Sequence, residues 1–293
     1  MNSIKKMMLS GALGCLISGM AYADGSSPQP VKPYWQAIQV VAVNKEKPRS
    51  SFMSYADRET ALTSRFEKSP YYFLLNGTWK FFFVDSYKDL PQNITDPSVN
   101  TSSWDDITVP GNWEVQGHGV AIYTNHGYEF KPRNPQPPLL PEANPVGVYR
   151  RDIEIPASWD NRDIYLHIGG AKSGLYVYLN GKEVGYSEDS KNPAEFLINK
   201  YLQPGKNVLT LKIFRWSTGS YLECQDFWRM SGIERDVFLW SQPKASIQDF
   251  RVVSTLDDTY TNGIFNWYSE CEFLYPADSH LNISALQARI CLG

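Results

Sequence analysis

Short segments in which apolar and polar residues alternate recur along most of the chain after residue 75. A period of two places every second side chain on one face and is typical of half-buried β-strands. The pattern predicts strands over residues 79–84, 149–155, 164–168, 175–179, 182–186, 207–215, 235–240 and 247–256. Their close spacing, without a long segment of helical period, indicates an all-β fold and favours a two-sheet sandwich of the jelly-roll type.

The clearest turn in this pattern is Asn180-Gly181, which separates two of the expected strands. Both residue types accept the positive φ angles of a type I′ turn, so a β-hairpin is predicted there. Residues 24–70 carry few alternating runs and are expected to form an extended leader with a short helical piece around residues 56–66. Six prolines between Pro132 and Pro145 indicate a stiff extended arm. We expect it to pack along the sandwich, and a docking peptide for a partner is the alternative.

The first 23 residues have the composition of a secretory signal. Lys5 and Lys6 precede a mostly apolar run, and Ala21-Tyr22-Ala23 offers the small residues that a signal peptidase requires. The run is too short for a stable membrane span, which needs about 20 apolar residues. The mature chain is therefore expected to start near Asp24 and to be secreted or periplasmic. Lipid attachment at Cys15 is a second option, which the short apolar sequence before it disfavours.

Composition excludes several classes of function. The net charge of −3 argues against a nucleic-acid binder, which needs a basic excess. The four histidines show no metal-ligand spacing with the cysteines, and neither a glycine-rich phosphate loop nor a G-x-S-x-G motif occurs. Four cysteines in 293 residues do not form a disulfide scaffold.

Two blocks combine aromatic, amide and carboxylate side chains: residues 109–114 with 122–125, and residues 215–229. Sugar recognition asks for this mixture, because hydroxyl groups need planar hydrogen-bonding partners and the C–H face of a sugar needs an aromatic ring. Asn125 could equally be a turn residue. The charged residues of the second block and its surroundings could form a purely structural ion-pair cluster: Glu223, Asp226, Arg229 and Arg235. Glu223 and Asp226 lie too close in sequence to favour a catalytic pair.

The same blocks carry a resemblance to a known family. Ordered motifs extend over roughly residues 33–265: Leu-Asn-Gly-Thr-Trp-Lys-Phe (75–81), Val-Pro-Gly-Asn-Trp (109–113), Ile-Tyr-Thr-Asn (122–125), Asn-Gly-Lys-Glu-Val-Gly-Tyr-Ser (180–187), Ser-Lys-Asn-Pro-Ala-Glu-Phe (190–196), Arg-Trp-Ser (215–217) and Gln-Asp-Phe-Trp-Arg-Met-Ser-Gly-Ile-Glu-Arg-Asp-Val (225–237). Together they resemble the N-terminal sugar-binding domain of the β-galactosidases of glycoside hydrolase family 2.

The resemblance implies a jelly-roll domain, then an immunoglobulin-like sandwich, then a catalytic barrel. It implies that Asn125 reaches the galactose site, and that Asp226 binds the galactosyl 6-hydroxyl and helps to hold a sodium ion. The resemblance implies sodium and magnesium as cofactors of the full-length family members, and no cofactor is assigned to this chain. Where the family commonly has a second acidic residue, Cys224 stands here and supplies no such charge at neutral pH.

The family's two catalytic glutamates lie on barrel strands beyond this chain, so no catalytic residue is expected in it. A barrel needs about 250 residues, and no Asn-Glu dipeptide, the family's acid/base signature, occurs. The expected organisation is a signal peptide (1–23), the leader (24–70), the jelly roll (71–243), the start of an immunoglobulin-like sandwich (244–265) and a tail (266–293) unlike the family. We expect a frameshifted or prematurely ended gene, with a divergent second domain as the alternative.

Three hypotheses for function follow. The chain is the N-terminal part of a secreted β-galactosidase, inactive alone; or a stand-alone carbohydrate-binding module; or a structural fragment that complements a chain carrying the barrel. The partners expected are galactoside sugars and the barrel-containing chain, with neither nucleic acid nor a membrane span. In the third hypothesis exposed rings of Tyr123, Trp216 and Trp228 would form the interface.

Overall fold

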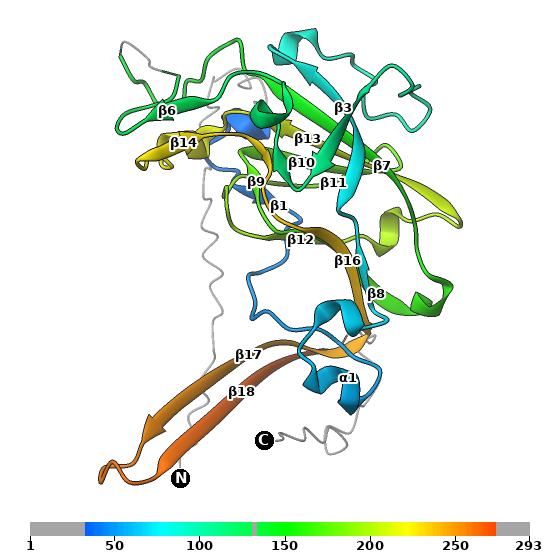
Figure 1. The fold of residues 1–293 in the computed structure, drawn as a ribbon, viewed down its shortest axis with the longest axis vertical. Coiled ribbons are helices and arrows are strands. Elements are labelled where there is room, and N and C mark those ends of the chain that lie inside the picture. The colour runs from blue at the N-terminus through cyan, green and yellow to red at the C-terminus, as the bar shows by residue number, and fades with distance from the viewer. Residues whose placement is uncertain (1–32, 131–133, 274–293) are drawn as a thin grey trace, which may run out of the picture. The chain divides into compact units, whose positions relative to one another are not determined.

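Two antiparallel sheets carry the fold in this computed structural model, which describes residues 33–130 and 134–273, with side chains up to residue 269. Figure 1 shows the course of the chain through these elements. The larger sheet has the strand order β1 (Ala42–Val43), β11 (Lys182–Ser187), β10 (Gly174–Leu179), β13 (Lys206–Phe214), β7 (Val146–Glu154), β3 (Gly77–Val84) and β4 (Asp105–Val109). The smaller sheet has the order β12 (Ala194–Leu197), β8 (Arg162–Ile168), β16 (Val237–Pro243) and β2 (Tyr72–Leu74).

Smaller elements complete the described part of the chain. Short strands form a three-stranded sheet of β5 (Gly111–Asn112), β15 (Gly232–Ile233) and β9 (Ala171–Lys172), and two pairs, β6 (Ile122–Thr124) with β14 (Phe227–Arg229) and β17 (Ala245–Leu256) with β18 (Gly263–Phe273). The α-helix among the described residues is α1 (Arg58–Leu62), and 3-10 turns occur at Tyr34–Gln36, Phe66–Lys68, Tyr87–Asp89, Glu114–Gln116, Ala157–Trp159, Asn199–Tyr201 and Thr218–Tyr221. The expected all-β sandwich is confirmed.

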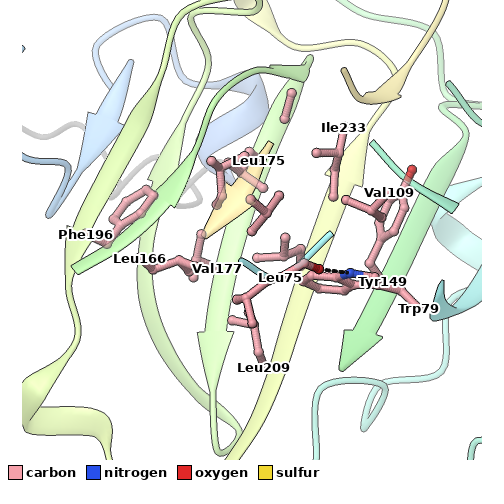
Figure 2. Packing of buried hydrophobic residues seen from close by; sticks show 14 of the residues in the cluster. Leu75, Trp79, Val109, Tyr149, Leu166, Leu175, Val177, Phe196, Leu209 and Ile233 are labelled. Atoms are coloured by element: carbon pink, nitrogen blue, oxygen red, sulfur yellow. Dashed lines mark hydrogen bonds between the residues drawn. The ribbon is translucent and has the colours of Figure 1, made fainter. Parts of the chain in front are cut away.

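The main core lies between the two large sheets. Trp79 and Phe81 of β3 and Leu211 of β13 pack in one cluster with Leu166 and Leu239 of the smaller sheet. Figure 2 shows part of this packing, including the bond that the Trp79 indole donates to the Leu75 carbonyl oxygen at 2.8 Å. Burial of these side chains, at about 25 cal/mol per Å² of apolar surface, stabilises the sandwich.

The outer faces of both sheets are also covered. A second cluster with Trp35 and Trp104 packs on β7, where Val146 and Val148 are fully buried. A third cluster, of Met53, Tyr165, Phe238 and Trp240, covers the smaller sheet. Strands buried on both faces lose strict alternation, which explains the continuous apolar run at the start of β7.

The predicted turn at Asn180-Gly181 is confirmed. The two residues have φ angles of 53° and 77°, as a type I′ turn requires, and Leu179 pairs with Lys182 beside them. The predicted helical piece is also present, as α1, which the Asp57 carboxylate caps by accepting a bond from Thr60 N at 2.8 Å.

The described part of the proline-rich segment packs against the sandwich. Asn144 is fully buried, donates to the Trp216 carbonyl oxygen at 2.8 Å and accepts from Trp216 N at 3.0 Å. The Tyr221 hydroxyl donates to the carbonyl oxygen of Leu139. These contacts support the expected packed arm for residues 134–145.

The second β-unit begins directly after the sandwich. Lys244 alone separates β16 from β17, and in the described residues β17 and β18 pair only with each other. The ladder crosses position 265 without interruption, since Ser254 pairs with Phe265 and Val253 with Asn266. The pairing thus gives no sign of a break at residue 265, and the expected frameshifted or prematurely ended gene stays a prediction. The expected domain boundaries also stay predictions. The expected signal peptide lies outside the described residues, and within them no helix is long and apolar enough to cross a bilayer.

Candidate functional site

The β6–β14 pair brings the two sequence-predicted binding residues to one end of the same short ladder. Asn125 follows β6, and Asp226 immediately precedes β14. Thr124 and Phe227, the neighbours of these two residues, are paired directly across the ladder. Residues about 100 positions apart in sequence thus meet because two three-residue strands pair.

The side chains here are exposed and partly engaged with one another. The Tyr123 hydroxyl donates to Asp226 Oδ1 at 2.7 Å, and this bond to a carboxylate raises the pKa of Tyr123. Asn125 Oδ1 lies 2.7 Å from His126 Nδ1. The rings of Tyr123 and Trp228 lie 5.6 Å apart, tilted by 58°, and both side chains are 53% exposed. The site therefore offers an amide, a carboxylate and two ring faces to solvent.

An open groove runs along this segment. It has a volume of about 550 Å³ and is lined by residues 123–128 and Pro135. Its lining contains neither Asp nor Glu. Hydrogen-bonding groups beside aromatic faces can hold a sugar ring, whereas glycoside cleavage requires two carboxyl groups.

A buried ion cluster lies under this site. Lys172 Nζ contacts Glu129 Oε1 at 2.8 Å, with side chains only 2% and 5% exposed. Arg215 lies 3.6 Å from Glu129 and 3.7 Å from Glu114, and it also donates to the carbonyl oxygens of Val120 and Arg229. Through these bonds the cluster ties both flanks of the β6–β14 pair to the sandwich.

The alternative of a structural cluster of Glu223, Asp226, Arg229 and Arg235 is not supported, because no ion pair joins these four described residues. Glu223 accepts from Ser190 N, Arg229 donates to the Glu223 carbonyl oxygen, and Arg235 donates to the Lys191 carbonyl oxygen. Sequence reasoning missed the true cluster. Its members are spread from position 114 to position 215, and no local pattern could have related them.

Two further expectations are resolved by burial. Trp216 is only 9% exposed, with Phe130 packed edge-on against it, so its expected role as an exposed interface ring is wrong. The free thiol of Cys224 donates to the Ser220 carbonyl oxygen at 3.3 Å, and burial raises its pKa. The thiol form is thus favoured at this position.

The sodium-holding role that the family resemblance implies for Asp226 stays a prediction. No group of three or more His, Cys, Asp or Glu side chains among the described residues could hold a metal ion. Asp226 supplies one exposed carboxylate, of which Oδ1 already accepts the Tyr123 hydroxyl. Hard cations take several oxygen ligands, so no binding step is derived from sodium or magnesium here.

Comparison with known proteins shows which family has this architecture. The family model for the glycosyl hydrolases family 2 sugar-binding domain matches residues 73–243. The chain belongs to glycoside hydrolase family 2. The matched region runs from β2 to the end of β16 and includes β6, β14 and the residues between them.

Similar proteins agree with this membership. A β-galactosidase of Priestia megaterium is 41% identical over 227 residues, and one of Psychromonas ingrahamii is 38% identical over 256 residues. These regions cover 77% and 86% of this chain but only 22% and 24% of the relatives, so the chain spans about a quarter of their length. A solved β-glucuronidase of an uncultured Clostridium sp. has a TM-score of 0.52 at 23% identity, covering 68% of this chain and 33% of that one, which shows the shared fold.

Proposed function

We propose that this chain is the N-terminal sugar-binding part of a secreted β-galactosidase and that Asn125 and Asp226 contact the galactosyl group. The observation that carries the proposal is the β6–β14 ladder, which presents both side chains at one end. The β-galactosidase relatives, at 38–41% identity, support the substrate class. The signal-like first 23 residues support secretion.

The chemistry of the two side chains suits a hexose. An ionised carboxylate accepts hydrogen bonds from hydroxyl groups, and an amide can both donate and accept. Tyr123 occupies one lone-pair site of Asp226 Oδ1 and holds the carboxylate in place, which leaves Oδ2 for a sugar hydroxyl. The half-exposed ring of Trp228 provides an apolar face beside it.

We further propose that the chain alone does not hydrolyse galactosides. Glycosidases place two carboxyl groups about 5–9.5 Å apart across the scissile bond. The groove beside Asn125 has no carboxyl group in its lining, and the Asp226 carboxylate accepts a hydrogen bond from the lining residue Tyr123. The described residues therefore support binding without cleavage.

Binding and turnover can be measured on the same protein. With only part of a sugar pocket, we expect galactose or lactose to bind with a dissociation constant no better than about 1 mM, near −4 kcal/mol. Asp226→Ala should abolish that binding in calorimetry, whereas Asp258→Ala, in an exposed turn of the β17–β18 hairpin, should not change it. Purified chain should release no chromophore from an aryl β-galactoside, and turnover that survives purification contradicts the proposal. Micromolar affinity lost in Asp226→Ala would instead favour a stand-alone binding module.

A second candidate function is complementation of a chain that carries the catalytic barrel. The observation that favours it is the pair of half-exposed rings, Tyr123 and Trp228, next to the sugar-binding residues. Large exposed aromatic side chains are enriched at protein interfaces.

Mixing experiments test this candidate. Activity on an aryl β-galactoside should appear only when the chain is combined with a barrel-containing fragment of a relative. The double change Tyr123→Ser and Trp228→Ser should lower the activity of the mixture by about tenfold or more, as for interface anchors worth at least 1.4 kcal/mol. An inactive mixture in which the two fragments remain monomeric excludes the candidate.

A further inference from the structure

A second cavity lies on the smaller sheet, and none of the residues of the sugar site line it. Its volume is about 340 Å³, within the range of small-molecule sites. The leader residues 45–53 form one wall, and side chains of β8, β12 and β16 form the other. The apolar part of the lining comes mainly from Phe52, Met53, Phe66 and Phe238.

The leader wall is held in place, so the cavity is preformed. Arg49 forms a two-pronged bond with Glu195, with Nε to Oε2 at 2.9 Å and Nη2 to Oε1 at 3.0 Å. Ser50 donates from its backbone N to Asp249 Oδ1 at 2.8 Å and from its hydroxyl to the Phe250 carbonyl oxygen at 2.7 Å. The Glu46 backbone N donates to the Glu195 carbonyl oxygen at 2.9 Å. A wall with bonds at positions 46, 49 and 50 needs little ordering when a ligand binds.

The floor contains a stacked pair of rings from β8 and β16. The His167 imidazole lies over the Phe238 ring with centroids 4.2 Å apart and an interplanar angle of 15°. Nδ1 of His167 lies 2.8 Å from Glu195 Oε1, and since an ionised carboxylate only accepts, Nδ1 carries a proton. Its other ring nitrogen, Nε2, has no hydrogen bond to any described residue.

The carboxylates that line the cavity already have partners. Glu195 accepts from Arg49, His167 and the Trp240 indole. Asp189 accepts from Asn192 Nδ2 at 2.9 Å and lies 3.7 Å from Lys45 Nζ. Glu46 also lines the cavity and has interactions of its own.

Two lysines of the leader wall keep unused donors. Lys45 has a side chain only 12% exposed, and its contact with Asp189 is too long for a hydrogen bond. Lys47 is exposed and makes no ion pair or hydrogen bond with the described residues. The donor capacity above the aromatic floor therefore comes from these two lysines, because Nε2 of a neutral His167 that is protonated on Nδ1 is an acceptor.

We propose that this cavity is a binding site for a small aromatic carboxylate, whose ring packs on Phe238 and Phe66 and whose carboxylate binds Lys45 and Lys47. Charge-assisted hydrogen bonds are about twice as strong as neutral ones. A ligand with an aromatic body and one anionic end uses both halves of the lining. A purely apolar ligand would leave the lysines without partners, and a neutral sugar would leave most of the apolar floor uncovered.

Calorimetric titration of the full chain with 1-naphthoate tests the proposal, with 1-naphthamide as the uncharged isostere. We expect one site per chain and about tenfold weaker binding of the amide, a difference of 1.4 kcal/mol. Lys47→Ala should weaken naphthoate binding about three- to tenfold. The matched control is Lys182→Ala, which replaces an exposed lysine of β11 that makes no ion pair with the residues the structure describes. It should leave naphthoate binding unchanged.

A blocking variant distinguishes this cavity from the exposed apolar side chains of the β17–β18 hairpin. Ser51 lines the cavity, is exposed and makes no hydrogen bond with the described residues, so Ser51→Trp can fill the space without breaking a contact. It should reduce naphthoate binding at least about tenfold. Excess galactose should not compete, because the cavity shares no residue with the groove beside Asn125. Equal binding of acid and amide, or full binding by Ser51→Trp, overturns the proposal.

Discussion

Replacing Glu195 with glutamine is expected to lower the free energy of unfolding by about 3–5 kcal/mol, the usual cost of removing one partner from a buried charge pair. The Glu195 side chain is 11% exposed and accepts bonds from Arg49, His167 and Trp240. A glutamine side chain places an N–H₂ donor against these donors and leaves the Arg49 guanidinium without its counter-charge. Arg49 joins the leader to the smaller sheet through Glu195 and through its stacking on Trp240 at 4.2 Å. Weakening the bond to Glu195 should therefore also loosen the leader from that sheet.

Urea denaturation, followed by tryptophan fluorescence, measures this loss. The matched control is Glu142→Gln, which removes the ion pair between Glu142 and Lys88. Its N···O distance of 2.8 Å is close to the 2.9 Å of the Arg49–Glu195 pair, but the Glu142 side chain is 86% exposed. Exposed pairs contribute about 0–1 kcal/mol, so the control should remain close to the parent protein. Equal effects of the two substitutions would show that the Glu195 contacts do not hold the leader.

The same carboxylate predicts how stability depends on pH. Burial alone would raise the pKa of Glu195, but the bonds from His167 and the charge of Arg49 outweigh it and hold the pKa below the usual 4.5. A lowered folded-state pKa gives stability that is fully present above about pH 4.5 and is lost as the pH falls through the folded-state value. Glu195→Gln should therefore flatten the acid side of the stability profile, relative to the parent protein, in denaturation curves recorded between about pH 3 and pH 6.

Replacing Lys172 with methionine is expected to destabilise the fold by a similar amount, about 3–5 kcal/mol. The substitution leaves the Glu129 carboxylate buried, with Arg215 at 3.6 Å as its remaining ion-pair partner among the described residues. Loss of this contact should also loosen the segment that leads from β6 into the groove. The free energy of unfolding in urea measures the effect, and the exposed lysine Lys80, paired with Asp106, gives the control Lys80→Met, expected within about 1 kcal/mol of the parent.

A double variant separates lost pairing from lost packing. If the cost arises from an uncompensated charge, then Lys172→Met with Glu129→Met should recover a large part of it, because apolar replacements of a buried pair are often neutral. A double variant that is less stable than Lys172→Met alone would contradict this interpretation and point to the remaining contacts of Glu129 with Arg215.

Most of the sandwich could be predicted from sequence because its strands carry their own pattern. The strands expected at residues 79–84, 164–168, 175–179 and 207–215 all lie within one or two residues of β3, β8, β10 and β13. The strand expected from residue 235 begins at Val237 instead, because Arg235 and Asp236 lie before the ladder with β8. Alternation locates a strand, but pairing with its neighbour decides where it ends.

The candidate site was only partly predictable. The motifs around Asn125 and Asp226 identified the residues, but the contact between Tyr123 and Asp226 depends on β6 pairing with β14. Trp216 belongs to the same aromatic-rich block as Trp228, yet Trp216 is 9% exposed with Phe130 packed against its ring, whereas Trp228 is 53% exposed. Composition cannot distinguish the two rings, because exposure depends on which distant segment packs above them.

The sequence by itself determined the strands, the Asn180-Gly181 turn and the family of this chain, since each depends on residues close together along the backbone. Only the tertiary structure decided which residues line the groove beside Asn125 and the cavity on the smaller sheet, and which buried residues pair with Glu129 and Glu195. Lys172 lies 43 positions from Glu129 and Arg49 lies 146 positions from Glu195. Their burial, and therefore the strength of their pairing, exists only once the sheets and the leader have packed around them.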